Sequence, residues 1–285
     1  MEAEGRGNPP AGGFPRPCRN VLPRWHSAGM ETAEHLAALR AEGELLARAA
    51  ARIDHRATAA GAPAWQAGDV LRHLGLVHRW AATAVRTGAQ DPDRYPDDDG
   101  SGVRGAELVG WFRAGHAALL ATLAEAEQDV STFTFLPARS PLAFWARRMT
   151  HETGIHRADV ESAGGPITPF DPAEALDGID EMVGGFGAHR SRRPPDGPVG
   201  TLGLLPVDSA AGWLVRLGEP PVRDPAAAAG ADCVLRATAS DLHLLLWNRP
   251  AGEVRTSGNP AVLDTWAEQV RVRWGGPPPA PAAPA

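Results

Sequence analysis

Lysine is absent from this sequence of 285 residues, in which all 28 basic side chains are arginine. This absence excludes enzymes that form a Schiff base through lysine, and nucleotide-binding proteins that need a P-loop lysine. Cysteine is almost absent as well, and Cys18 and Cys233 are too few for a disulfide framework. No bridge between them is expected, because Cys18 lies in a segment without periodicity. Cys233 is expected to be a small buried hydrophobe rather than a nucleophile.

The sequence also lacks long apolar runs and an excess of positive charge. No apolar stretch approaches the roughly 20 residues that span a bilayer, and no apolar segment of a secretory signal follows the N-terminal arginines. We therefore expect a cytoplasmic protein that does not enter the membrane. The net charge of −6 argues against nucleic acid as a partner, because phosphate binding needs a basic surface. The chain is long enough for two modest domains, but its oligomeric state does not follow from the sequence.

Four segments with different composition are predicted along the chain. Residues 1–29 are rich in Gly, Pro and Arg and are expected to form a disordered extension, so that Met30 is a candidate natural start. Residues 30–168 are predicted to form the first domain and residues 169–275 the second. Residues 276–285 are a Pro/Ala tail that is expected to be disordered.

The first domain carries four amphipathic helical patterns. They begin near Thr32, Asp69, Ala106 and Pro141, and the last is expected to stop at Gly164. Four such helices with the intervening loop lengths predict an all-α four-helix bundle. The second domain starts with a helix and continues with short β-like runs in GTLGLLPVD, AGWLVRLG and DCVLRATA. A helix capped by Ser240 and a final helix follow, so this domain is predicted to be a small α+β domain.

The fourth helical pattern contains the sequence HETGIH, which has the residue types of a metal site. Glu152 and His156 are four residues apart, so they differ by about 40° around a helix and project from one face. His151 and His156 are five apart and differ by about 140°, so a regular helix cannot direct both at one metal. This spacing also differs from that of zinc proteases. We therefore prefer Glu152 with His156, although such a pair can also be an exposed contact.

A third ligand has to come from another helix, and the second helical pattern offers His73 and His78. His73 lies among apolar positions, whereas His78 precedes Arg79 and is expected to lean toward the polar side, so His73 is preferred. Asp69 and Asp159 are candidates to orient the imidazoles of His73 and His156.

Two histidines and one carboxylate suit Zn²⁺, with Fe²⁺ or Ni²⁺ as alternatives. Three protein ligands leave one position open, as in catalytic sites, and an incoming thiol could bind there as thiolate.

Several stretches of this sequence resemble one family in the family's own order. APAWQAGDVLRHLGLVHRWAA and RRMTHETGIHRADVESAGG resemble the two metal-binding segments of the mycothiol-dependent maleylpyruvate isomerase family. DPAEALDGIDEMV, ASDLHLLLWNR and GNPAVLDTWAEQV resemble its second domain. The resemblance runs from about Glu31 to Trp274. Two departures are Gln66-Ala67, where the family often has Thr-Val, and Asn248, where it often has Gly.

The resemblance implies a DinB-like four-helix bundle followed by an SCP2-like α+β domain. It also implies a divalent metal, usually zinc, held by His73, Glu152 and His156, and mycothiol as the thiol cofactor. Arg249 best matches a functional arginine of the family, which would pair with a substrate carboxylate and stabilise enolate charge.

The implied reaction is cis–trans isomerisation or thiol transfer on a small electrophilic substrate. The alternatives are a metal-stabilised protein that binds a ligand in an apolar groove, and a metal-dependent hydrolase of thiol conjugates.

Overall fold

The computed structural model describes residues 29–61, 65–92, 95–188 and 200–270. Of the extension predicted for residues 1–29, only Gly29 is described, and the tail predicted for residues 276–285 lies outside the described residues.

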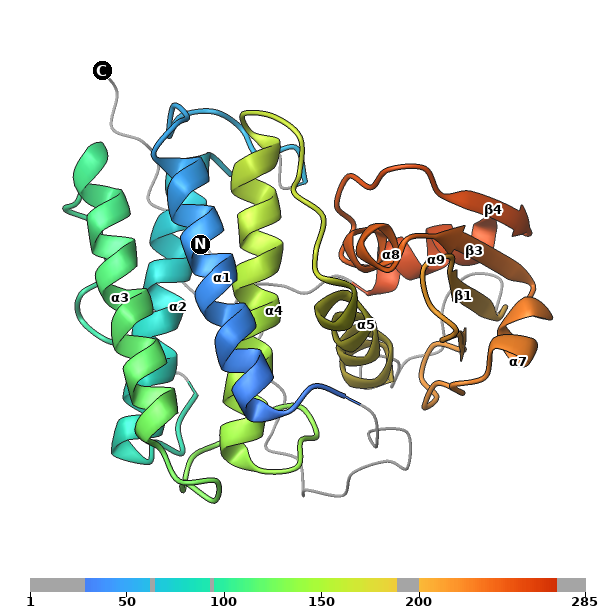
Figure 1. The fold of residues 1–285 in the computed structure, drawn as a ribbon, viewed down its shortest axis with the longest axis horizontal. Helices are drawn as coiled ribbons and strands as arrows, with labels where there is room; N and C mark the ends of the chain where they lie inside the picture. The colour runs from blue at the N-terminus through green and yellow to red at the C-terminus, as the bar shows by residue number, and fades with distance from the viewer. Residues whose placement is uncertain (1–28, 62–64, 93–94, 189–199, 271–285) are drawn as a thin grey trace, which may run out of the picture.

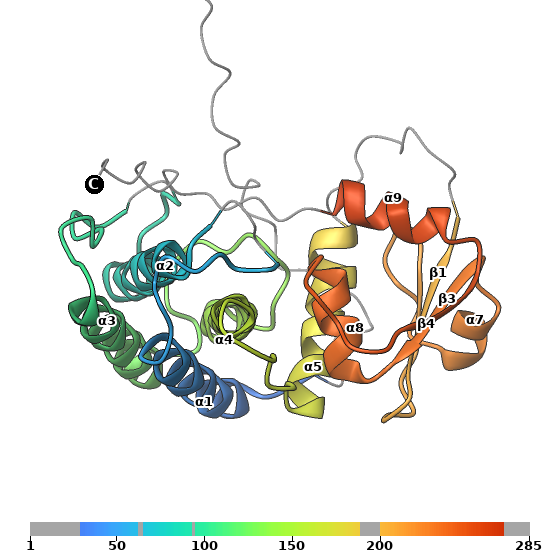
Figure 2. The same ribbon diagram turned by 90° about the horizontal axis from the view of Figure 1, so that it is seen from above.

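Four long helices lie side by side and form the first part of the molecule (Figure 1). Helix α1 packs against α4, and α2 packs against α3. Figure 2 shows the four helices nearly end-on, with α4 on the side that faces the rest of the chain. The prediction of an N-terminal four-helix bundle is therefore confirmed. The helices are α1 (Thr32–Ala50), α2 (Ala67–Thr87), α3 (Ala106–Glu125) and α4 (Pro141–Ser162).

Local sequence signals fix the ends of the helices that matter most for function. Helix α4 begins at Pro141, and the Ser140 hydroxyl caps it by accepting a hydrogen bond from the Ala143 amide. It ends at Ser162, just before the predicted Gly164 stop. Helix α2 begins with a capping box in which Asp69 accepts from the Gln66 amide.

The second part is a small α+β region, as predicted, with a mixed four-stranded sheet of order β2-β1-β3-β4. Strands β1 and β3 are parallel, and β2 and β4 pair antiparallel at the edges. Helices α5, α8 and α9 cover the face toward the bundle, while α7 covers the other face (Figure 2). The elements are α5 (Pro172–Asp180), the π-helical turn η2 (Glu181–Gly187), β1 (Leu202–Pro206), β2 (Trp213–Val215), α7 (Pro225–Ala229), β3 (Cys233–Ala237), α8 (Ala239–Leu246), β4 (Arg255–Gly258) and α9 (Ala261–Gln269).

Three details of this region differ from the sequence prediction. Ser240 does not cap α8; Thr238 does, by accepting from the Asp241 amide, and the Ser240 hydroxyl accepts instead from the Phe170 amide. Helix α7 and strand β4 were not predicted, because the first is a single Ala-rich turn and the second lacks apolar alternation. The buried Cys233, in the central strand β3, agrees with its expected role as a small hydrophobe.

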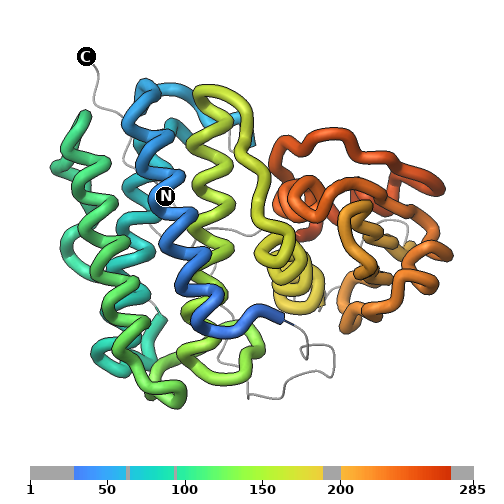
Figure 3. Tube along the Cα trace, in the orientation of Figure 1, coloured from blue at the N-terminus to red at the C-terminus, as the bar shows by residue number. Residues whose placement is uncertain are grey.

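Helix α4 is shared by the two parts. Its Ile155 and Ala158 belong to the hydrophobic cluster of the sheet region, while its Trp145 and Met149 belong to a cluster of the bundle. The chain leaves the end of α4 and runs back along it to α5 (Figure 3). Four charged side chains of α4 are therefore buried, namely Arg148, Glu152, Arg157 and Asp159. Within the described residues, no helix is long and apolar enough to cross a bilayer.

Candidate metal centre

Helices α2 and α4 bring His73, Glu152 and His156 together inside the bundle. One ligand atom from each residue lies within 4.8 Å of the other two. The Nε2 atoms of His73 and His156 are each 3.5 Å from the same Glu152 Oε1, and the two imidazole centroids are 5.1 Å apart. Glu152 and His156 are one helical turn apart, so the geometry of α4 alone places them together. His73 reaches them because α2 packs beside α4.

The two neighbouring histidines stay outside this group. His151 points to the other side of α4, where its Nε2 lies 2.8 Å from Asp177 Oδ1, as expected from the five-residue spacing to His156. His78 does not lean toward the polar side, and that expectation was wrong. It is fully buried and bonds to the Thr153 hydroxyl at 2.9 Å. Burial therefore does not separate His73 from His78; the direction of each ring does.

Two side chains support His156: Asp159 of α4 and, behind it, Arg249 from the second part of the molecule. His156 Nδ1 lies 3.0 Å from Asp159 Oδ2, as predicted for Asp159. Arg249 holds both oxygens of Asp159, with Nε at 2.6 Å and a terminal nitrogen at 2.9 Å. Its other terminal nitrogen donates to the Trp247 carbonyl. Because a carboxylate only accepts, Asp159 holds His156 through an Nδ1–H donor, and the Nε2 atom on the other side of the ring faces Glu152 and His73.

The end of α8 aims Arg249 at Asp159. The Asn248 amide donates to the Leu245 carbonyl and the Arg249 amide to the Leu244 carbonyl, which is the Schellman pattern of a helix end. Asn248 has a φ of 58° and occupies the left-handed position of that pattern. The pattern explains why glycine also suits this position. Gly61 lies directly against the Arg249 side chain, and a Cβ at this position would collide with it.

Arg148 supports Glu152 and was missed in the sequence prediction. One guanidinium nitrogen donates to Glu152 Oε2 at 3.0 Å, and the other pairs with Glu181 of η2. The guanidinium also lies over the rings of Trp247, at 5.2 Å, and Phe186, at 5.4 Å. The sequence signal that could have predicted this contact was the four-residue spacing of Arg148 and Glu152 on one helix. With Oε2 held by Arg148, Oε1 is directed at the two histidines.

The Asp69 side chain serves the start of α2. Its two oxygens contact the Gln66 amide at 3.1 Å and the Arg72 guanidinium at 3.5 Å. Asp69 therefore completes the capping box of α2. The imidazole of His73 packs edge-on against Trp65, with ring centroids 5.2 Å apart, and its orientation by Asp69 stays a prediction.

Electrostatics favour a cation between the three side chains. Burial opposes ionisation of Glu152, but hydrogen bonds with His156 and His73 and the charge of Arg148 hold its pKa far below its ordinary value. Burial likewise opposes protonation of His156, yet the hydrogen bonds with Asp159 and Glu152 outweigh it and raise its pKa. Two imidazoles and an ionised carboxylate form a donor set that fits Zn²⁺ or a similar divalent ion.

Comparison with known proteins identifies a similar N-terminal domain and a similar fold. The family model of the mycothiol maleylpyruvate isomerase N-terminal domain matches residues 36–161. Two solved structures share the fold: the mycothiol-dependent maleylpyruvate isomerase, at a TM-score of 0.57 and 15% identity, and a histidine-to-alanine mutant of it, at 0.58 and 13%. Each match covers 80% of this chain and 93% of the other. No curated protein matches the sequence.

Proposed function

Because the family model of the mycothiol maleylpyruvate isomerase N-terminal domain matches residues 36–161, we propose that this protein is a metal-dependent enzyme that uses mycothiol. It would act on a small electrophilic substrate, as a maleylpyruvate isomerase-like cis–trans isomerase or as a mycothiol S-transferase. The observation that carries the proposal is the convergence of His73, Glu152 and His156 on one point inside the bundle. Such a donor set leaves a coordination position for a thiol.

Each residue of the site has a role that follows from its contacts. A divalent cation, when bound, would supply the charge that keeps a thiol in its thiolate form at neutral pH. His73 and His156 would offer imidazole nitrogens to that cation, and Glu152 would offer the oxygen that Arg148 leaves toward them. Asp159 keeps the proton of His156 on Nδ1, so that Nε2 remains a ligand atom.

The protein needs no cysteine of its own for this chemistry. Cys233, the cysteine within the described residues, is fully buried in the sheet, and burial raises the pKa of its thiol. A buried protonated thiol is a poor nucleophile. Within the described part of the chain no cysteine is placed to supply the thiol, which fits a thiol cofactor such as mycothiol.

Thiol-dependent turnover tests the proposal directly. Zinc-loaded protein should isomerise maleylpyruvate, or conjugate a halogenated aromatic electrophile, with mycothiol and not without it. Calorimetry should show mycothiol binding that chelation of the metal abolishes. If turnover does not depend on thiol and mycothiol does not bind, the proposal fails. Thiol-independent hydrolysis of mycothiol conjugates would instead identify a metal-dependent hydrolase.

Arg249 is expected to act through Asp159, because all three of its guanidinium nitrogens already donate within the chain. Arg249→Gln should keep the metal but lower kcat by about 10–100-fold, the usual effect of removing support from a metal ligand. Asp159→Asn should give the same defect, and Arg249→Lys should restore part of the activity. Steady-state kinetics and metal analysis provide the measurement.

A direct contact between Arg249 and the substrate would give a different result. In that case Arg249→Gln would raise KM for substrates that carry a carboxylate and leave neutral electrophiles unaffected, while Asp159→Asn would not reproduce the effect. That outcome would contradict a positioning role for Arg249. It would favour instead the pairing with a substrate carboxylate that the family resemblance implies.

A further inference from the structure

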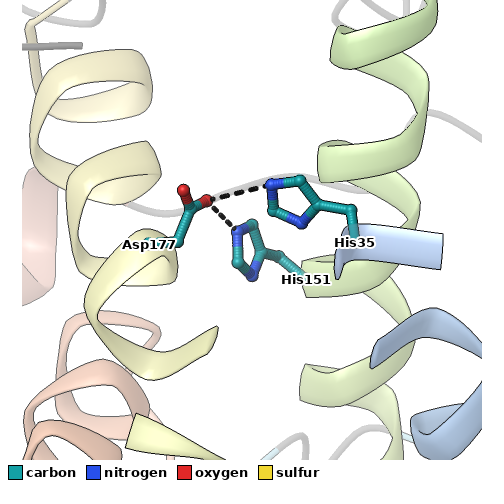
Figure 4. A group of neighbouring side chains, drawn as sticks. All are labelled: His35, His151 and Asp177. Carbon is teal, nitrogen blue, oxygen red and sulfur yellow. Dashed lines mark hydrogen bonds and ion pairs between the residues drawn. The ribbon is translucent and has the colours of Figure 1, made fainter. Parts of the chain in front are cut away.

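A second group of two histidines and one carboxylate lies on the other side of α4, at the junction of the bundle and the α+β region. His35 comes from α1, His151 from α4 and Asp177 from α5, the first helix of the α+β region. Figure 4 shows both imidazoles directed at the Asp177 carboxylate from the side opposite α5. This group contains none of the residues of the first site.

The three side chains have the convergence that a metal site requires. His151 Nε2 is 2.8 Å and His35 Nε2 is 3.6 Å from the same oxygen, Asp177 Oδ1. One ligand atom from each residue lies within 4.8 Å of the other two. The imidazole centroids are 5.7 Å apart. This arrangement resembles the first site, where two Nε2 atoms also meet one carboxylate oxygen.

All three side chains of this group are almost completely buried. The exposed fractions of His35, His151 and Asp177 are 2%, 0% and 4%. Within the part of the chain that the structure describes, the Nδ1 atoms of His35 and His151 have no hydrogen-bond partner. An ion held by the two Nε2 atoms would not contact these Nδ1 atoms, so the case for an ion rests on the convergence of both Nε2 atoms on Asp177 Oδ1.

The positive charge of Arg147 lies beside the Asp177 carboxylate and would repel a bound cation. Its Nε donates to Asp177 Oδ1 at 2.6 Å and a terminal nitrogen donates to the Asp177 carbonyl at 2.8 Å. The Met30 amide donates to Oδ2 at 3.1 Å. A carboxylate oxygen has two lone pairs, so Oδ1 can accept from Arg147 and still bind an ion. The positive charge nearby should nevertheless make this site weaker than the first.

We propose that His35, His151 and Asp177 form a second divalent-metal site, for Zn²⁺ or an ion of similar preference such as Co²⁺ or Fe²⁺. Two imidazoles and one carboxylate are ligands that these ions share. A bound ion would join α1 and α4 of the bundle to α5 and so fix the α+β region against the bundle. Because the ion binds only where the three helices are assembled, it should stabilise the folded protein.

Metal stoichiometry tests the second site without any assay of catalysis. The full-length protein, stripped with chelator and dialysed against excess Zn²⁺ or Co²⁺, should hold two equivalents by elemental analysis. His35→Asn and His151→Asn should each hold one, as should the double variant His73→Ala/His156→Ala. Combining His35→Asn with that double variant should leave none. His116→Asn, which changes a buried histidine outside both groups, is the matched control and should keep two equivalents.

Calorimetric titration of the unaltered protein covers the case in which a variant does not fold. Two binding events of different affinity are expected, with the weaker event absent from His35→Asn. A single event that is lost in His73→Ala/His156→Ala and kept in His35→Asn would overturn the second site and leave the first intact. A single event lost only in His35→Asn would support the second site and contradict the first.

Discussion

His73→Ala and Glu152→Gln should each lose the metal of the first site and, with it, thiol-dependent turnover. Removing a group that merely supports a metal ligand lowers affinity or activity by about 10–100-fold, so loss of a ligand itself should cost at least about 100-fold. Glu152→Gln is a stringent test, because the amide keeps the shape of the side chain and can still accept from Arg148. The substitution removes the negative charge and replaces one carboxylate oxygen with an NH2 group, which cannot bind a metal ion.

The measurement combines metal content with mycothiol-dependent rate in one preparation. Helix content should stay close to that of the unaltered protein, since neither residue starts or ends a helix. His78→Asn is the matched control: it changes a buried histidine of the same helix that bonds to Thr153, and it should retain metal and activity. Full metal content in both site variants would show that these residues do not bind the ion.

Arg148→Met should produce the largest loss of stability. The substitution removes the cation that pairs with Glu152 and Glu181, both of which are buried. Breaking a buried ion pair from one side costs about 3–5 kcal/mol, because the remaining charge is left without compensation. Methionine fills much of the space beside Trp247 and Phe186, so a packing defect contributes less. Urea unfolding in the presence of chelator measures the change without a contribution from bound metal.

A second variant separates charge from packing. Arg148→Met leaves two buried carboxylates without their cation. Adding Glu181→Gln removes the charge of one of them and should recover part of the lost free energy of unfolding. Arg148→Lys should lie between the unaltered protein and Arg148→Met, because lysine keeps the charge but cannot reach both carboxylates in the same geometry. If Arg148→Met unfolds within about 0.5 kcal/mol of the unaltered protein, the buried pairs contribute little.

Much of the fold followed from patterns that repeat over short distances. The four bundle helices, with starts near Asp69 and Pro141, and the mixed strands and helices after Asp171 were predicted because periodicity and helix-start signals act within a few residues. The α8 cap was misassigned because Thr238 and Ser240 both have a hydroxyl that can cap. The contact of Ser240 with Phe170, far away in sequence, decided between them.

For the site, the sequence by itself determined that Glu152 and His156 share a face of α4 and that His151 does not, because 3.6 residues per turn leaves no alternative. Only the tertiary structure decided which histidine of α2 faces that pair, since His73 and His78 lie on buried parts of the same helix. It also decided that Arg249 holds Asp159, 90 positions away. Helical geometry fixes directions within one element, whereas contacts between elements depend on how whole faces pack.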